Sequence, residues 1–178
     1  VIFSDGGCQV ATGSSAAAIV IRSPAAGPVW RRDRTSTAEY PLQHQATHSQ
    51  YFMQSTVNVM EVVALIAALR VAIRTQRRSL IITDSRNAIN WLFGRSNIAT
   101  TNVAKPLVEK AQQLYSTCAG HVSVARMNRD DGNPADAGVK TAMNEARGIG
   151  DEALFDSPPA IAPRIRIRTQ QANTHAAE

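Results

Sequence analysis

The most apolar segment of the chain is "NVMEVVALIAALRVAI", residues 58 to 73, and its length predicts a buried helix over 58–76. The apolar run "SLIIT" at 79–83 predicts a strand directly after it. Upstream, strands are expected at 1–4 and 16–23, separated by a turn that begins at Gly6 and Gly7, and a third strand at 27–32. Residues 33–56 are polar and show no period, which predicts a loop or insertion.

The second half of the chain alternates helices and strands. Ser85 is the expected cap of a helix that ends before Gly94, and residues 103–118 predict an amphipathic helix. A strand is expected at 121–127, and Asn133 caps a last helix that has Pro134 in its first position. Three strands, a helix, a strand, two helices, a strand and a helix predict an α/β fold. Its mixed five-stranded sheet, an antiparallel meander plus parallel strands, would be flanked by helices.

Composition and length bound the organisation of the chain. The 178 residues are 44% apolar and 19% charged, as in a globular domain. We expect this domain over 1–147, with the polar insertion at 33–56, and a Pro/Arg-rich tail over 148–178. The two cysteines are far apart, which favours a reducing intracellular compartment, nucleus or cytoplasm, with an organelle left open. Because the sequence opens on a strand without a Met, we expect a piece of a longer or processed polypeptide.

The charge of the chain is weakly informative about a partner. A net charge of +5, with basic clusters at 30–34, 74–78 and 164–168, favours a polyanion such as nucleic acid. The cluster at 74–78 also has a simple explanation, since cations favour a helix C-terminus. No apolar run approaches the ~20 residues of a membrane span.

Four acids stand at equivalent places in the predicted elements. Asp5 and Asp84 follow strands, while Glu61 and Asp136 lie in the first turns of helices. Each has an ordinary explanation: Asp5 as a turn residue, Asp84 and Asp136 as favourable charges at helix starts, and Glu61 in a capping box with Asn58. Strand ends and helix starts meet at one edge of such sheets, however, and four carboxylates there would need cations. Oxygen-only ligands favour Mg²⁺ or Mn²⁺ over Zn²⁺.

The segments "IFSDGG", "TVNVMEVVALIAAL", "LIITDSRNAI" and "NPADAGVKTAM" together resemble the ribonuclease H family, along residues 1 to about 146. The resemblance implies a ribonuclease H-like fold and hydrolysis of the RNA strand of RNA–DNA hybrids by a two-metal-ion mechanism. Asp5, Glu61, Asp84 and Asp136 would be the catalytic residues and would bind two Mg²⁺ ions, or Mn²⁺. It also implies a hybrid-binding role for the neighbours of these acids, Gly6, Gly7, Thr56 and Asn58.

The sequence departs from the family in the loop before the last acid. Family members commonly carry a His there, whereas this loop reads "RMNRDDGN", so Arg126 or Arg129 is expected to take part of that role and Arg126 to contact substrate. Two other readings stay open. The domain could be a binding or scaffold module in a ribonucleoprotein or polymerase assembly, or another nuclease or transposase of the same fold. As an enzyme, the domain could belong to a reverse transcriptase polyprotein of a retrotransposon, fused to or docked on a larger polymerase through its C-terminal tail.

Overall fold

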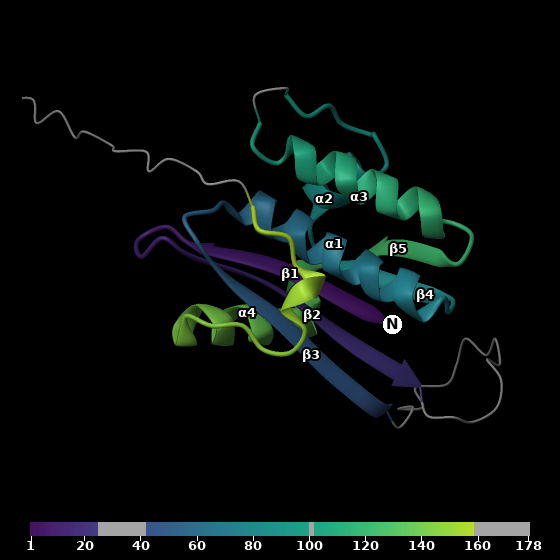
Figure 1. Cartoon of the computed structure of the whole chain (residues 1–178), viewed down its shortest axis with the longest axis horizontal. Helices are drawn as coiled ribbons and strands as arrows, with labels where there is room; N and C mark the ends of the chain where they lie inside the picture. Colours follow the sequence, from purple (N-terminus) through teal and green to yellow (C-terminus); the bar gives the residue numbers. More distant parts are fainter. Residues whose placement is uncertain (25–41, 100–101, 159–178) are drawn as a thin grey trace, which may run out of the picture.

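A computed structural model describes residues 1–24, 42–99 and 102–158 of the chain. Five strands form one sheet in the order β3-β2-β1-β4-β5 (Figure 1). They are β1 (Ile2–Gln9), β2 (Ser14–Pro24), β3 (Leu42–Met53), β4 (Ser79–Thr83) and β5 (Val122–Arg126). The first three strands are antiparallel, while β4 and β5 run parallel to β1. The predicted α/β fold and the order of its elements are confirmed.

Helices cover both faces of the sheet. They are α1 (Val57–Thr75), α2 (Arg86–Leu92), α3 (Lys105–Cys118) and α4 (Pro134–Glu145), with short 3-10 turns η1 (Arg129–Asp131) and η2 (Glu152–Leu154). Figure 1 shows α1, with α2 and α3 beside it, on one face and α4 on the other. The apolar core divides accordingly, with a large cluster around α1 and a small one between α4 and β2. No helix among the described residues is long and apolar enough to cross a membrane.

The first and third strands differ from the prediction. Strand β1 continues to Gln9, so Gly6 and Gly7 lie inside a strand and not in a turn. The third strand is β3 at 42–53, within the segment predicted to be a loop, while the expected strand at 27–32 lies outside the described residues. β3 follows β2 from Ser14↔Met53 to Arg22↔Gln45. Main-chain pairing to a long neighbour therefore makes a strand of a sequence whose side chains gave no strand pattern.

Helix α1 is buried along most of its length, with 13 of its 19 residues in the core. Its N-cap is Thr56, whose hydroxyl accepts a hydrogen bond from Val59 N–H at 3.3 Å. The expected capping box of Asn58 and Glu61 is therefore wrong, because Asn58 already lies inside the helix. Glu61 is beyond the first turn, and its burial needs another explanation.

Helix α4 lies unusually close to the sheet. A side-chain carbon added at Gly138 would stand 3.0 Å from Ala18 Cβ and 3.2 Å from Thr47 Cγ2. Gly138 is a poor helix former, but a larger residue would separate α4 from β2 and β3. The cost in helix propensity is thus offset by close packing, which holds the start of α4 near the centre of the sheet.

The described part of the predicted tail packs on the domain. Ile149 and Ser49 exchange two main-chain hydrogen bonds of 2.9 Å, which adds a short bridge to the outer edge of β3. Leu154 and Phe155 then enter the core beside α1. Asp156 binds Arg70 of α1 at 2.7 Å and Lys110 of α3 at 2.8 Å. The boundary between domain and tail at 147/148 stays a prediction, and these contacts favour a later one, after Asp156.

Candidate active site

Asp5 and Asp84 lie on neighbouring parallel strands at the centre of the sheet. Asp5 is in the middle of β1, and Asp84 follows the last residue of β4. The parallel register pairs Ser4 with Thr83, so the residues that follow them, Asp5 and Asp84, lie next to each other. Asp5 was predicted at the end of a strand and lies inside one. Its neighbour across the sheet is nevertheless Asp84, as expected.

Glu61 reaches the same place because α1 touches β1 at a glycine. A side-chain carbon at Gly6 would stand 2.2 Å from the backbone nitrogen of Glu61 and from the carbonyl carbon of Met60. Only glycine allows the helix this close. Because Gly6, next to Asp5, has no side chain, α1 packs against β1 closely enough to bring Glu61 near Asp5.

Asp136 approaches from the opposite face, in the first turn of α4. The N-cap of α4, Asn133, accepts a hydrogen bond from Ala135 N–H and donates one of 2.9 Å to the carbonyl of Ser4. That second bond ties the start of α4 to β1, one residue before Asp5. Asp136 remains half-exposed and forms an i,i+4 ion pair of 2.6 Å with Lys140.

The other three acids crowd around Asp5. Burial first, and then the negative charges of Asp84, Asp136 and Glu61, raise the pKa of Asp5 from 3.8 to about 7, against a lowering effect of the Gly6 N–H. Burial also raises the pKa of Glu61, which the hydrogen bond from Ser85 opposes. The predicted set of acids is thus gathered in one place, where the neighbouring charges disfavour the ionisation of Asp5 and the charge of Asp84 disfavours that of Glu61.

Ser85 has a function that the sequence did not reveal. It was predicted as the cap of α2, and its hydroxyl oxygen does accept the Ala88 N–H at 3.1 Å. The same hydroxyl donates a hydrogen bond of 2.5 Å to Glu61 Oε2, and Ser85 is only 3% exposed. The cap of one helix therefore fixes the carboxylate of another. Its position next to Asp84 in "TDSRN" was the only available signal.

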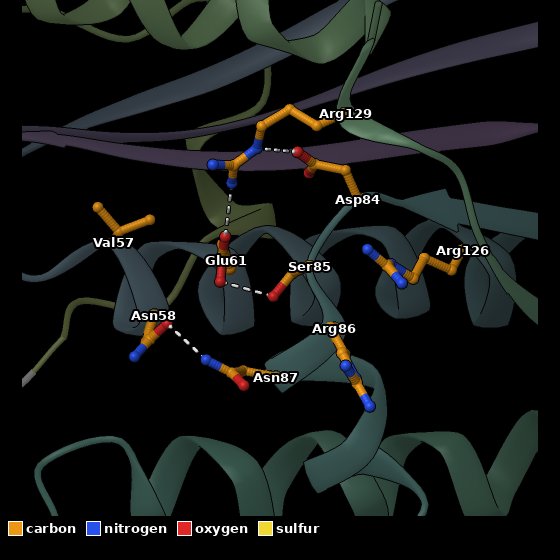
Figure 2. Close-up of a pocket in the computed structure, with 9 residues that line it drawn as sticks. All are labelled: Val57, Asn58, Glu61, Asp84, Ser85, Arg86, Asn87, Arg126 and Arg129. Atoms are coloured by element: carbon orange, nitrogen blue, oxygen red, sulfur yellow. Dashed lines mark hydrogen bonds and ion pairs between the residues drawn. The ribbon is translucent and has the colours of Figure 1, made fainter. Parts of the chain in front are cut away.

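Arg129 of η1 contacts two of the acids (Figure 2). Its Nε donates to Asp84 Oδ2 at 3.0 Å, and its Nη2 stands 3.9 Å from Glu61 Oε1. Asp84 Oδ1 is buried and has no hydrogen-bond partner. In the described ranges no three His, Cys, Asp or Glu side chains are close enough to hold one ion together in this arrangement. The cation between Asp84 and Glu61 is the guanidinium of Arg129.

A pocket of about 500 Å³ opens beside Glu61 and Asp84. Its opposite wall is polar or basic, and Asn87 Nδ2 donates to Asn58 Oδ1 there at 3.2 Å (Figure 2). The nine residues that line it are Val57, Asn58, Glu61, Asp84, Ser85, Arg86, Asn87, Arg126 and Arg129. Asn58 and Arg126 were predicted near the site, whereas no pattern in the sequence indicated Arg86 and Asn87.

The remaining predicted residues lie next to the site with packing roles of their own. Thr56 is exposed and caps α1. Gly6 faces the backbone of α1, and a side chain at Gly7 would meet Val139 Cγ1 at 2.6 Å. Close packing is sufficient to explain both glycines. Contact of Gly6, Gly7 and Thr56 with substrate stays a prediction.

Several solved structures share this fold. RNase H1 of the halophilic archaeon Halobacterium salinarum superposes with a TM-score of 0.62 at 19% identity, over 81% of this chain and 96% of that one. LC11-RNase H1 in complex with an RNA/DNA hybrid gives 0.59 at 20% identity, over 82% and 96%. A foamy viral protease-reverse transcriptase in complex with dsDNA gives 0.56 at 19% identity, over 81% and 93%. At these identities the likeness concerns the fold alone.

The amino-acid sequence itself matches one family. The family model described as RNase H matches residues 1–136, which is most of the chain and ends on the last of the four acids. Among curated proteins, no sequence matches this chain significantly.

Proposed function

This chain belongs to the ribonuclease H family of enzymes, and we propose that it hydrolyses the RNA strand of RNA–DNA hybrids with bound divalent cations. The observation that carries the proposal is the crowding of three further carboxylates around Asp5, each from a different element. We propose Asp5, Glu61, Asp84 and Asp136 as the catalytic residues and the cation ligands. The ordinary explanations of the single acids, as turn or helix-start residues, do not account for their convergence on Asp5.

The donor set fits hard divalent cations. All four side chains offer carboxylate oxygens, which suit Mg²⁺ or Mn²⁺ better than Zn²⁺. Asp84 Oδ1, buried without a donor, has a free lone pair. The raised pKa of Asp5 is the expected property of a ligand cluster without its positive charge. When bound, a pair of such ions would supply Lewis acidity at the phosphate and would activate the attacking water.

The chain's own residues would prepare the site and hold the substrate. Ser85 fixes Glu61 Oε2 and leaves Oε1 directed toward the pocket. The amides of Asn58 and Asn87 offer donors and acceptors at the pocket wall, which suit the 2′-hydroxyls that distinguish RNA from DNA. Arg126, exposed at the rim, would bind a phosphate.

The proposed reaction is an in-line displacement at phosphorus. Water adds to the phosphorus, the bond to the 3′ oxygen breaks, and that oxygen takes up a proton. The products are a 3′-hydroxyl and a 5′-phosphate on the two RNA fragments. No base needs to be read, since the 2′-hydroxyls and the A-like shape of the hybrid provide the recognition.

The test is cleavage of an end-labelled RNA–DNA hybrid with Mg²⁺, Mn²⁺ or EDTA, with single-stranded RNA and duplex DNA as controls. We expect cleavage of the RNA strand of the hybrid alone, only with a divalent cation, and a loss of at least about a hundredfold in Asp84→Asn. The variant must first show cooperative melting. Tight hybrid binding without cleavage in any cation would contradict the proposal and would favour a binding or scaffold module.

A further inference from the structure

Arg129 occupies a position that opposes the proposed chemistry. It places a positive charge between Asp84 and Glu61, where the proposed function requires a divalent cation. The two carboxyl groups are 7% and 6% exposed, whereas the arginine side chain is 76% exposed. The guanidinium therefore reaches from solvent onto two buried acids, and most of its own side chain remains in water.

The contacts of Arg129 use the oxygens that a cation would need. Ser85 already holds Glu61 Oε2, so Oε1 is the free oxygen of that carboxylate, and it faces Arg129 Nη2. On Asp84 the guanidinium binds Oδ2 and leaves Oδ1 without a partner. A divalent ion held by these two acids would meet a positive charge at close range. The guanidinium and the ion thus exclude each other by repulsion as well as by space.

The segment that carries Arg129 allows it to leave. The turn η1 is three residues long and contributes no buried residue. Two backbone hydrogen bonds, Asp131 N–H to Asn128 and Gly132 N–H to Arg129, hold it at 3.2 and 3.4 Å. A rotation of the exposed side chain about its own bonds would free both carboxylates without disturbing β5 or α4.

We propose that Arg129 is a tethered counter-ion that holds the acids in the absence of metal and sets the cation affinity of the site. It compensates the charges of Asp84 and Glu61 until a divalent cation displaces it. Arg129 and Arg126 both line the pocket (Figure 2), so a displaced guanidinium would be available to a phosphate of the substrate. This inference rests on the proposed function, because it assumes that the acids bind cations.

The test compares two arginine variants of the whole chain. Arg129→Gln removes the guanidinium that contacts the acids. Arg126→Gln removes the same charge from the same pocket, and among the described contacts Arg126 has no ion pair. Binding of Ca²⁺ or Mn²⁺ is measured by calorimetry at pH 7.5 and fixed ionic strength, without nucleic acid. Melting in EDTA is measured on the same samples.

We expect Arg129→Gln to bind Ca²⁺ roughly three- to tenfold more tightly, because the affinity of a site is reduced by the fraction of time it is closed. The Ca²⁺ affinity of Arg126→Gln should stay within about twofold of that of the parent chain, since Arg126 is exposed and solvent screens its charge. In EDTA, Arg129→Gln should melt at a lower temperature than Arg126→Gln, because two buried acids lose their counter-ion.

Other outcomes overturn the inference. Equal tightening in both variants would indicate a general charge effect, and weaker or unchanged binding in Arg129→Gln would exclude competition. The proposed function fails separately, if no variant binds any divalent cation or cleaves a hybrid. A chain that cleaves hybrids with Mg²⁺ while Arg129→Gln keeps the parental Ca²⁺ affinity would retain the function and lose only the counter-ion.

Discussion

Replacing Asp5 by asparagine should stabilise the metal-free protein at neutral pH. Burial and three neighbouring negative charges raise the pKa of Asp5 from 3.8 to about 7. In the unfolded chain this group ionises near its ordinary value. Between these two pH values the folded state binds more protons than the unfolded one. The free energy of unfolding therefore falls as the pH rises from about 4 to about 7, and it is level above that.

The structure sets the size of the effect. A shift of about three pKa units corresponds to about 4 kcal/mol at pH 8, as an upper limit, because neighbouring charges rearrange when the site ionises. Asparagine keeps the oxygen that accepts the Gly6 N–H at 2.8 Å, so this hydrogen bond survives. We expect Asp5→Asn to exceed the parent chain by about 2–4 kcal/mol in free energy of unfolding at pH 8, and to match it near pH 4.

The assay is urea denaturation in EDTA from pH 4 to 8.5. Glu152→Gln, an exposed acid in the turn η2 away from the site, is the matched control and should show no such trend. With Mg²⁺ present the gap should narrow or reverse, since the parent chain gains more from cation binding. An Asp5→Asn chain that is no more stable at pH 8, or whose advantage does not change with pH, would refute the crowding argument.

Three further predictions concern packing around the site. Gly6→Ala should cost about 3 kcal/mol or more in urea denaturation, because its Cβ meets helix backbone, whereas Gly120→Ala, with open space around it, should be nearly neutral. Ser85→Ala should lower the free energy of unfolding by about 1–2 kcal/mol and should also lower the Ca²⁺ affinity, and Ser85→Thr should restore both. A loss of stability without a loss of Ca²⁺ affinity would show that Ser85 acts as a helix cap alone. Removal of residues 157–178 should leave the melting temperature nearly unchanged. Removal of residues 149–178 should lower it by about 10 °C, because the core then loses Leu154 and Phe155. Equal effects of the two truncations would contradict this prediction.

Elements with a strong pattern were predictable from the sequence, and the third strand was not. Helix α1 has 13 buried residues of 19, and strand β4 has a continuous apolar centre, Leu80 to Ile82, so both have a pattern that can be read locally. Strand β3, "LQHQATHSQYFM", is at the edge of the sheet and has polar side chains at most positions. It is a strand because β2 offers a ladder of main-chain partners from Ser14 to Arg22. That partner lies far away in sequence, so no local pattern could report it.

The four acids of the candidate site were predictable as a set, and their supports were not. Asp84 and Asp136 stand at a strand end and a helix start, as the sequence indicates, whereas Asp5 lies inside β1 and Glu61 beyond the first turn of α1. The supporting residues act over long separations in sequence. Ser85 binds Glu61, 24 positions away, and Arg129 binds Asp84, 45 positions away. Asn133 binds the carbonyl of Ser4, 129 positions away. Ser85 and Asn133 were each predicted as helix caps, and each is one. Their second hydrogen bonds depend on how α2 and α4 meet the sheet, which spacing along the chain does not encode.

The acids of the site repel one another, so packing elsewhere in the fold must hold them together. The packing of α1 provides this. The helix presents Glu61 to three other acids, and Gly6 brings its backbone against β1 at that very turn. A helix held on one side could relieve the repulsion by moving outward. Helix α1 cannot do so, because α3 packs against it from above and Leu154 and Phe155 close the core beside it. The burial of 13 of its 19 residues therefore explains why the most apolar segment of the chain carries the buried glutamate, because a helix fixed by packing along most of its length keeps that carboxylate among the other acids.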